Sequence, residues 1–589
     1  MKKFLIGLLT GLVLAGMIVF IAGLVFASLG DRKVKVADGS VLVMRLEGDV
    51  PEKPQTDMPI PFLEKEGNAV TVTEIWRSLD RASSDSKIKA IILEPHNTAM
   101  GWAKMQEIRA DLVKFKKSGK PIYAYLRNPG LREYYLASAA DKIYFTPTDV
   151  LYIKGLRAEL TYYKGTLDKL GVQMEMEHAG KYKDALDSFV RTSMTPETRE
   201  VMNSFLDDLY GQIVTTIAGS RKKSEAEVRA MIDDGPLLSK VSVERGLIDG
   251  LLFEDQFYDE VKKIAGVPEL KKISMAEYSQ ANRATDTRNK IAILVGDGAI
   301  TRGSSPASAL GEESGITSTS MMKQIRQIRD DSSIKGVILR VDSPGGDAIA
   351  SDEILREMKL LSQKKPMVIS MSDVAASGGY YISMTGDPVL AYPGTITGSI
   401  GVIFGKVNLR GLYDKIGVTK DTLIRGKNAA IDSEYTALGP DGRKKLKEGI
   451  DEIYQTFLGH VASARKKDVK VIEDLAQGRA WLGSQAKSRG LVDELGGLDR
   501  SLELIKEKAK IGPNEKVALM LFPPKKTLFE QLFAKTAQAT TRMWMLANGE
   551  TTGIVIPFEK QMESELGFSP RLLLDGHILG MLPYHMEFR

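Results

Sequence analysis

The chain has 589 residues, of which 43% are apolar and 27% are charged, and its formal net charge is +5. This length is too great for one hydrophobic core and predicts three or four domains. No basic stripe interleaved with aromatic residues is present, so we expect no nucleic-acid partner. The sequence contains no cysteine, which excludes disulfides and thiol catalysis.

The amino-terminal segment is the first predicted element. Residues 4–29 form an uncharged run that follows Lys2 and Lys3. About 20 apolar residues span a bilayer, whereas a cleavable signal peptide has a shorter apolar region of roughly 7–15 residues. We therefore expect residues 1–30 to be an uncleaved single-pass anchor in the inner (cytoplasmic) membrane, with cleavage as the alternative. By the positive-inside rule the remaining chain would lie on the extracytoplasmic, periplasmic side.

Short β-branched runs then alternate with helical patterns. The runs are residues 41–50, 88–93 and 121–125 in the first half, and 291–300, 334–339 and 366–370 in the second. Strands that alternate with helices are typical of βαβ units around a mainly parallel sheet. The sequence therefore predicts an α/β fold.

The two halves of the chain are copies of one another. Identical residues recur 246 positions apart, and further on 244 apart: Tyr134 with Tyr380, Asp141 with Asp387, Pro147 with Pro393, Gly155 with Gly401, and Gly246 with Gly490. Such a period indicates an internal duplication. We expect a first repeat at 31–285, a second repeat at 286–510, and an extension at 511–589 without a counterpart or an assigned role. In that extension, residues 528–533 show a helical apolar pattern.

The two copies differ at a serine and at a lysine. Ser399 lies on a glycine-flanked turn, and Ile153 stands opposite it in the first copy. Lys183 has Ala429 opposite it in the second copy. A lysine acts as a base near neutral pH only if its pKa falls by about three units, which burial can supply. We predict that Ser399 is a nucleophile and Lys183 its base, with the neighbouring Asp184 turned away.

An acyl-transfer site also needs hydrogen-bond donors for the oxyanion. The stretch 342–346 (Asp-Ser-Pro-Gly-Gly) follows a predicted strand and precedes a helix. We expect the amides of Gly346 and Ile400 to be the donors, with Gly345 and Gly398 in support. A plain strand-to-helix turn is the alternative for this stretch.

Other candidates for the catalytic groups stay open. Ser377 lies on a second glycine-flanked turn and is either a rival nucleophile, a supporting residue or a helix N-cap. The chain has five histidines, none of them between residues 290 and 450, although His178 could fold near a serine. The sequence lacks an HExxH motif and a Cys/His cluster, so we expect neither a metal nor another cofactor.

Four motifs together resemble the long form of signal peptide peptidase A, the protease IV family of Ser-Lys peptidases. They are 180–183 (GKYK), 342–346 (DSPGG), 375–381 (AASGGYY) and 397–402 (TGSIGV). The resemblance runs from the anchor to about residue 510. It implies two tandem crotonase- or ClpP-like domains, a homotetramer on the membrane, and cleavage of leftover signal peptides and other short apolar peptides.

The resemblance also bears on the choice of serine. In Clp-type proteases the serine of the AAS motif is the nucleophile, whereas the resemblance to signal peptide peptidases implies the later serine, Ser399. Residues 423–426 have no hydroxyl where some relatives place a serine that orients the lysine. What orients Lys183, and whether the dyad forms within one chain or between subunits, stay open.

Two other classes of function compete with a peptidase. One is a catalytically idle membrane scaffold that binds peptides in the same grooves. The other is a crotonase-type acyl-thioester enzyme that uses Gly345 and Gly346 as its oxyanion hole. The presence of Ser399, Lys183 and Gly346 together favours the peptidase.

Overall fold

The computed structural model describes residues 34–54, 70–281, 289–303 and 315–524, the strand at 578–581, and positions 11 and 17. Apart from Gly11 and Met17, the predicted anchor lies outside these residues, as does the apolar pattern at 528–533. Within the described ranges, no helix is long and apolar enough to cross a membrane.

The first repeat is built on a six-stranded parallel sheet of order β8-β4-β3-β2-β1-β9. Its strands are β1 (Ser40–Gly48), β2 (Ile88–Thr98), β3 (Ile122–Leu126), β4 (Lys142–Phe145), β8 (Gly250–Leu251) and β9 (Lys271–Ser274). The connecting helices include α2 (Val72–Ser84), α3 (Trp102–Lys116), α4 (Leu131–Ala137), α10 (Glu254–Ile264) and α11 (Met275–Gln280). The predicted strands of this half are confirmed.

The second repeat has a sheet of order β19-β17-β15-β13-β10-β21, in which β17 and β19 are antiparallel. Its main strands are β10 (Lys290–Asp297), β13 (Ile334–Ser343), β15 (Met367–Ala376), β17 (Ile396–Gly398), β19 (Ala480–Leu482) and β21 (Ala518–Phe522). Two further strands, β16 (Val389–Ala391) and β20 (Glu494–Leu495), extend it from β15. Because β21 pairs with β10 as β9 pairs with β1, this sheet continues past residue 510 to Phe522.

The helices of the second repeat and its surroundings are α12 (Ser318–Asp330), α13 (Ala348–Ser362), α14 (Gly378–Ile382), α15 (Arg410–Ile416), α17 (Val469–Leu475), α18 (Gly483–Ser488) and α19 (Leu498–Lys508). The remaining elements of the first repeat are β5 (Val150–Leu151), α5 (Lys164–Leu170), α6 (Asp187–Val190), α8 (Glu225–Asp233), β7 (Leu237–Leu238) and α9 (Ser239–Glu244).

Tertiary contacts repeat along with the sequence. The hydroxyl of Tyr134 donates to the carbonyl of Leu247 at 2.7 Å, and that of Tyr380 donates to Leu491 at 2.8 Å. Each repeat also has a 26-residue helix that begins with proline, α7 (Pro196–Arg221) and α16 (Pro440–Arg465). The duplication therefore holds in three dimensions.

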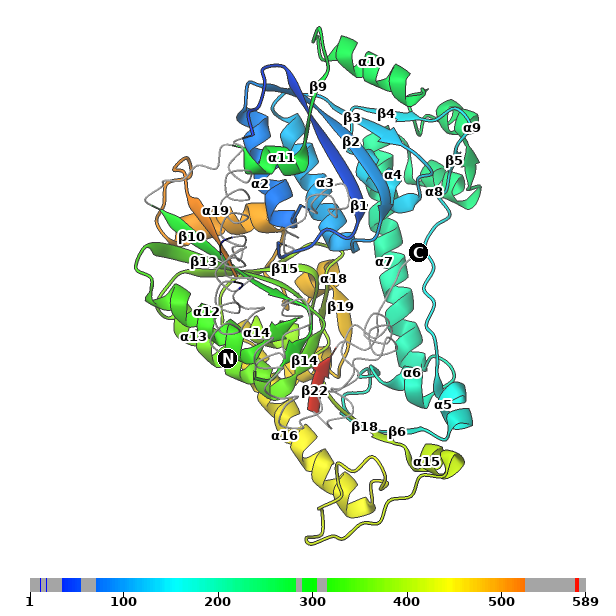
Figure 1. Ribbon diagram of the computed structural model, residues 1–589, viewed down its shortest axis with the longest axis vertical. Helices are drawn as coiled ribbons and strands as arrows, with labels where there is room; N and C mark the ends of the chain where they lie inside the picture. Colours follow the sequence, from blue (N-terminus) through cyan, green and yellow to red (C-terminus); the bar gives the residue numbers. More distant parts are fainter. Residues whose placement is uncertain are drawn as a thin grey trace.

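A third sheet joins the two repeats in the order β12-β11-β14-β22-β18-β6. Its strands are β6 (Gln173–Ala179), β11 (Ile300–Thr301), β12 (Ile316–Thr317), β14 (Gly345–Asp347), β18 (Val402–Asn408) and β22 (Ile578–Met581). β6 of the first repeat runs antiparallel to β18 of the second, with Val402 opposite Ala179 (Figure 1). This pairing places the end of β6 beside the start of β18, which directly follows the glycine-flanked turn of Ser399.

Buried charges also connect the repeats. The guanidinium of Arg340 contacts Glu52 at 2.8 Å and Glu107 at 2.6 Å, with its side chain fully buried. Lys104 lies 2.9 Å from Asp342. In both cases a first-repeat side chain pairs with a second-repeat side chain, so the two domains are docked through desolvated ion pairs.

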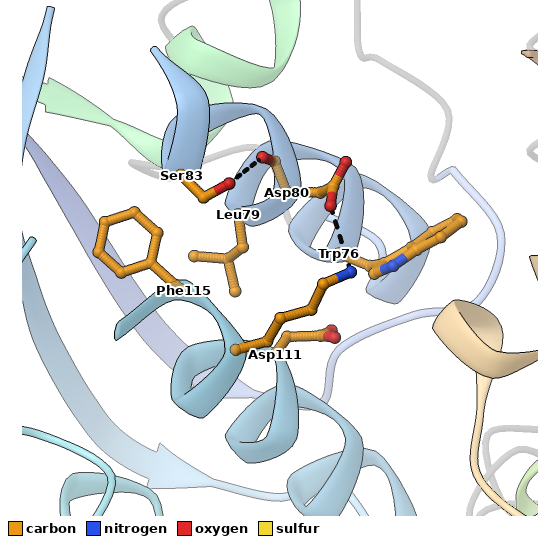
Figure 2. A pocket seen from close by; sticks show the side chains of 7 residues that line it. Trp76, Leu79, Asp80, Ser83, Asp111 and Phe115 are labelled. Atoms are coloured by element: carbon orange, nitrogen blue, oxygen red, sulfur yellow. Dashed lines mark hydrogen bonds and ion pairs between the residues drawn. The ribbon is translucent and has the colours of Figure 1, made fainter. Parts of the chain in front are cut away.

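A small pocket opens between α2 and α3 of the first repeat (Figure 2). Trp76, Leu79 and Phe115 line it together with Lys114, which pairs with Asp80 at 3.3 Å. Asp111 is buried there, and its Oδ2 has no hydrogen-bond partner among the described residues. Burial raises the pKa of Asp111 well above its usual value. Burial therefore disfavours the ionised form of the Asp111 carboxyl group.

Candidate active site

Lys183 reaches the second repeat through a turn at the end of β6. Gly180 adopts a left-handed φ of +103°, and the amide of Tyr182 donates to the carbonyl of Gln477 at 2.8 Å. A Cβ on Gly180 would lie 2.4 Å from the carbonyl carbon of Gln477, so glycine is required for this approach. The turn therefore places Lys183, which is 1% exposed, inside the other domain.

The side-chain nitrogen of Lys183 contacts both candidate serines. Its Nζ lies 2.7 Å from the hydroxyl of Ser377 and 3.0 Å from the hydroxyl of Ser399. It also lies 3.0 Å from the backbone carbonyl oxygen of Ser399. The predicted pair thus comes together within one chain, and Ser377 joins it.

The surroundings of Lys183 favour its neutral form. Burial lowers the pKa of Lys183 well below its usual value, and Asp184 opposes this only in part. The carboxylate of Asp184 accepts a hydrogen bond from the hydroxyl of Thr198, and burial raises its pKa to about 7. Asp184 therefore holds a proton in part at neutral pH, and among the described residues its side-chain hydrogen bond is with Thr198 rather than with Lys183.

Ser377 lies on a strained turn between β15 and α14. Its φ is +54° and its ψ is −113°, a conformation that non-glycine residues rarely adopt. It stands at the N-cap position of α14, but its side chain makes no capping hydrogen bond. A serine on a strained strand-to-helix turn resembles the arrangement called a nucleophile elbow, but Ser377 is fully buried here.

Ser399 lies on a different kind of turn, between β17 and β18. Its φ is +50°, and Gly398 before it has a φ of +76°. The amide of Ser399 donates to the carbonyl of Arg479 at 2.8 Å, and the amide of Gly478 donates to the carbonyl of Ile400 at 2.8 Å. These bonds fix Ser399 and Ile400 against the loop of residues 476–479.

That loop is a functional element that the sequence analysis missed. It holds the turn of Ser399 on one side and the Lys183 turn on the other. A Cβ on Gly478, whose φ is +77°, would lie 2.6 Å from the Cβ of Lys183. Its only local signal is one glycine between a predicted helix and a strand, which is too common to single out.

The glycine-rich loop of the candidate oxyanion hole abuts the start of α14. A Cβ on Gly346, whose φ is +152°, would lie 2.0 Å from the carbonyl oxygen of Ile300. A Cβ on Gly378 would lie 3.1 Å from the Cα of Gly345 and 3.2 Å from the amide nitrogen of Gly346. The amide of Gly346 thus lies beside the residue that follows Ser377.

Comparisons with known proteins agree with the duplication. Residues 114–268 and 359–512 each match the sequence model described as peptidase family S49. The chain belongs to peptidase family S49.

Three S49 relatives match over most of their length. The chloroplastic serine protease SPPA of Arabidopsis thaliana is 34% identical over 82% of this chain and 72% of its own. Protease 4 of Salmonella typhi is 32% identical over 82% and 80%, and Protease 4 of Haemophilus influenzae is 28% identical over 85% and 84%. The protein is thus a serine peptidase of the long protease IV form, with two S49 domains.

The resemblance to Clp proteases is not tested by the solved structures. A ClpP1 mutant from Listeria monocytogenes matches 36% of this chain and 94% of its own, at 14% identity and a TM-score of 0.22. The ClpP-like character of the two S49 domains therefore stays a prediction.

In the first S49 repeat the equivalent site is filled. The carboxylate of Glu133 accepts hydrogen bonds from the amide of Thr98 at 2.8 Å and from its hydroxyl at 2.7 Å. By the repeat spacing of 246, Thr98 stands opposite Pro344 and Glu133 opposite Gly379. A buried carboxylate therefore lies where the second repeat has Gly379, and it binds Thr98, whose counterpart Pro344 has no amide hydrogen.

His178 is not placed as a base in this S49 site. Its Nδ1 lies 2.9 Å from the carbonyl oxygen of Gly180. Within the described ranges, it makes no hydrogen bond to Ser377 or Ser399. The geometry therefore gives a Ser-His arrangement no support.

Proposed function

We propose that this S49 peptidase works with a Ser-Lys dyad in which Lys183 is the general base. The observation that carries the proposal is a fully buried lysine whose amine contacts two serine hydroxyls, at 2.7 and 3.0 Å. A base must lie within about 2.6–3.2 Å of the atom that loses the proton. Burial supplies the lowered pKa that this chemistry needs.

The proposed nucleophile is Ser399, with Ser377 as the rival, because membership of family S49 supports the later serine and the amine of Lys183 contacts both hydroxyls. Both serines have a left-handed φ, +50° for Ser399 and +54° for Ser377. Loss in the first repeat does not separate them either, because Leu131 stands opposite Ser377 just as Ile153 stands opposite Ser399. Ser377 then orients Lys183 through its hydroxyl, at 2.7 Å.

In this mechanism the neutral amine of Lys183 takes the proton of Ser399 Oγ as that oxygen attacks the scissile carbonyl. The amide of Gly346, with that of Ile400 after the nucleophile, stabilises the oxyanion. Lys183 passes the proton to the leaving amine. A water molecule then hydrolyses the acyl-enzyme, with Lys183 again as the base.

The substrates we propose are cleaved signal peptides and other short apolar peptides. β14 and β18 flank the site and are both paired with β22, so an extended peptide would pair with them by taking the place of that strand, with a small residue next to the cut. The proposal keeps the anchor at 1–30, the periplasmic location and the homotetramer. Support for subunit contacts comes from exposed apolar side chains in α15 and the segment that follows it. Ile416 is 62% exposed and Leu423 is 92% exposed.

The test is to map a serine-directed fluorophosphonate and to measure peptide hydrolysis in single variants. Ser399→Ala should lose the label and about 10³-fold or more in kcat. Ser377→Ala should keep the label on Ser399 but react more slowly, with a shifted pH profile, because Lys183 is held less well. A label on Ser377 that survives Ser399→Ala would reverse the assignment.

The same assay separates the two competing classes of function. An idle scaffold would bind apolar peptides without hydrolysing them. An acyl-thioester enzyme would retain its activity in Ser399→Ala and Lys183→Ala. Preferential cutting of polar or folded substrates would contradict the proposed substrate class.

A further inference from the structure

A second lysine of the first repeat, Lys104, also reaches into the second repeat. It lies in the first turn of α3, and its side chain is 5% exposed. Its Nζ lies 2.9 Å from the carboxylate of Asp342, 3.6 Å from that of Asp49 and 3.7 Å from that of Asp373. Because Asp342 and Asp373 belong to the second repeat, this buried cation joins the two halves of the chain, as Lys183 does.

Asp342 is the first residue of the candidate oxyanion loop, 342–346. Its Oδ2 pairs with Lys104, its Oδ1 accepts a hydrogen bond from the amide of Val374 at 3.0 Å, and its carbonyl accepts one from the amide of Gly298 at 2.8 Å. At the other end of the loop, Gly346 has a left-handed φ of +152°. Such a glycine loses more conformational freedom on folding than other residues do. The loop therefore depends on bonds at its ends, and Lys104 makes one of them.

Asp373 attaches the same end of α3 to the strand that leads to Ser377. Its carboxylate accepts hydrogen bonds from the amide of Gly101 at 2.9 Å and from the amide of Lys104 at 2.8 Å. A Cβ on Gly101 would lie 2.3 Å from the carboxyl carbon of Asp373, so a larger residue would displace this buried group. The first turn of α3 thus contacts both β13 and β15 near their carboxyl ends, where the candidate site lies.

The charges of this contact are not repeated in the other half of the chain. At the repeat spacing of 246, the counterparts are Ala350 for Lys104, His96 for Asp342 and Arg127 for Asp373. At these positions the lysine occurs only in the first repeat and the carboxylates only in the second. Lys183 and Ser399 are divided between the repeats in the same way, so the Lys104 contact follows the distribution of the proposed dyad.

We propose that Lys104 is a positioning residue for the peptidase reaction, which holds the amide of Gly346 at the oxyanion through its ion pair with Asp342. The inference rests on the proposed function. Lys104 acts through the loop rather than on the reacting atoms. Hydrogen-bond donors stabilise a developing oxyanion when they are held in place beforehand, and a displacement of about 1 Å can cost about 10²-fold in rate. The first repeat thus supplies one lysine that accepts a proton and another that fixes the loop.

The experiment compares kinetic constants of the full chain with those of Lys104→Met, which removes the charge and keeps an apolar side chain. For a short apolar peptide, kcat should fall about 10²-fold while KM stays within about twofold, because the amide of Gly346 acts on the transition state. The inhibition constant of a peptide aldehyde should rise by the same factor, since its adduct with the serine places an oxygen at the oxyanion position. The apparent pKa of the kcat/KM profile should not move, because the contacts of Lys183 are unchanged.

The matched control lies at the other end of the same helix. Lys116 pairs with Asp141 at 2.9 Å, within the first repeat. Lys116→Met should keep the wild-type kcat and the wild-type inhibition constant for the aldehyde.

A double variant separates positioning from simple charge balance, and it serves where Lys104→Met alone does not fold. Lys104→Met combined with Asp342→Asn removes both charges of the closest pair, so it should be more stable to urea than the single variant. Its kcat should stay low, because no ion pair holds the loop. Recovery of stability and of kcat together would show that Lys104 only balances charge, and would overturn the proposal.

The remaining outcomes distinguish this inference from the function on which it rests. If Lys104→Met keeps the wild-type kcat, raises KM alone or shifts the apparent pKa, Lys104 does not act through the oxyanion loop and the inference is wrong, while the peptidase stands. A wild-type chain without peptide hydrolysis, or full activity in Lys183→Ala, would contradict the proposed function and this inference with it.

Discussion

Two buried lysines in this protein show how neighbours decide the chemistry of one side chain. Burial alone would lower the pKa of Lys104, but Asp342 and Asp373 raise it well above the usual value. Lys183 is buried just as deeply, with hydroxyls and a carbonyl in place of carboxylates, and its pKa falls. The first lysine is a structural cation, and the second is suited to accept a proton.

The pH dependence of peptide hydrolysis should follow Lys183. The neutral amine is the active form, so kcat/KM should rise with pH, with an apparent pKa well below 10.5. Lys183→Ala and Lys183→Arg should each lose about 10³-fold or more, because arginine stays protonated. The neighbouring Lys181→Ala, whose side chain lies over the Tyr182 ring, is the control and should stay near wild type. A rate that falls as pH rises through neutrality would argue against a lysine base.

Asp111 should limit stability at neutral pH. Its pKa is raised in the folded state, so the folded protein holds this proton more tightly than the unfolded chain does. Below about pH 4 the carboxyl is protonated in both states, and above that pH the wild type loses stability as pH rises. Asp111→Asn should therefore raise the free energy of unfolding by about 1 kcal/mol or more at pH 7.5, and by little at pH 4.

Urea unfolding of both proteins at the two pH values checks this prediction. Asp207→Asn on the exposed face of α7 is the matched control and should show no such difference. An equal gain at both pH values would mean that ionisation of Asp111 is not the cause.

At the level of elements, the loop of residues 476–479 determines whether the dyad assembles. Gly478→Ala would force a Cβ to 2.6 Å from the Cβ of Lys183 and to 2.7 Å from its backbone nitrogen, at a φ of +77°. Because the obstacle includes backbone, Lys183 must shift, and kcat should fall at least about 10²-fold.

The matched control is Gly459→Ala in α16, where nothing lies within 4 Å of the added carbon. It should keep full activity and gain about 0.5–1 kcal/mol of stability from helix propensity. If both glycine variants hydrolyse peptide at the wild-type rate, the loop does not position Lys183.

The elements that sequence patterns predict well are those with local causes. The β-branched runs predicted β1, β2, β10 and β13. The repeat spacing indicated that the two long helices, α7 and α16, correspond. Lys183 was predictable because its loss in the other copy is visible in sequence. The repeat comparison alone could not choose between Ser377 and Ser399, since both are lost in the first repeat, and both have a left-handed φ and contact Lys183.

The contacts of β22 were beyond sequence reasoning for a different reason. Its partners lie more than 170 residues away in the chain, and a four-residue apolar segment carries no register information. Likewise, the loop of residues 476–479 acts through backbone hydrogen bonds that any sequence can make. Such long-range backbone contacts leave no side-chain pattern to detect.

At the level of the whole molecule, docking of the repeats depends on Arg340. Removing one partner of a buried ion pair leaves an uncompensated charge and costs about 3–5 kcal/mol. Arg340→Met should lower the free energy of unfolding by that amount, because Glu52 and Glu107 would lose their shared cation. Arg326→Met, which breaks a surface pair with Glu357, should cost less than about 1 kcal/mol in the same urea titration. Equal losses would show that Arg340 does not hold the domains.

Because Lys183 and the two serines belong to opposite halves of one polypeptide, base and nucleophile are always present in equal number. Their encounter is intramolecular, so the local concentration of one around the other is set by the fold and does not fall on dilution. In the first repeat, the carboxylate of Glu133 binds Thr98 at the equivalent position. The duplicated chain therefore has one proposed site, and its two halves cannot separate.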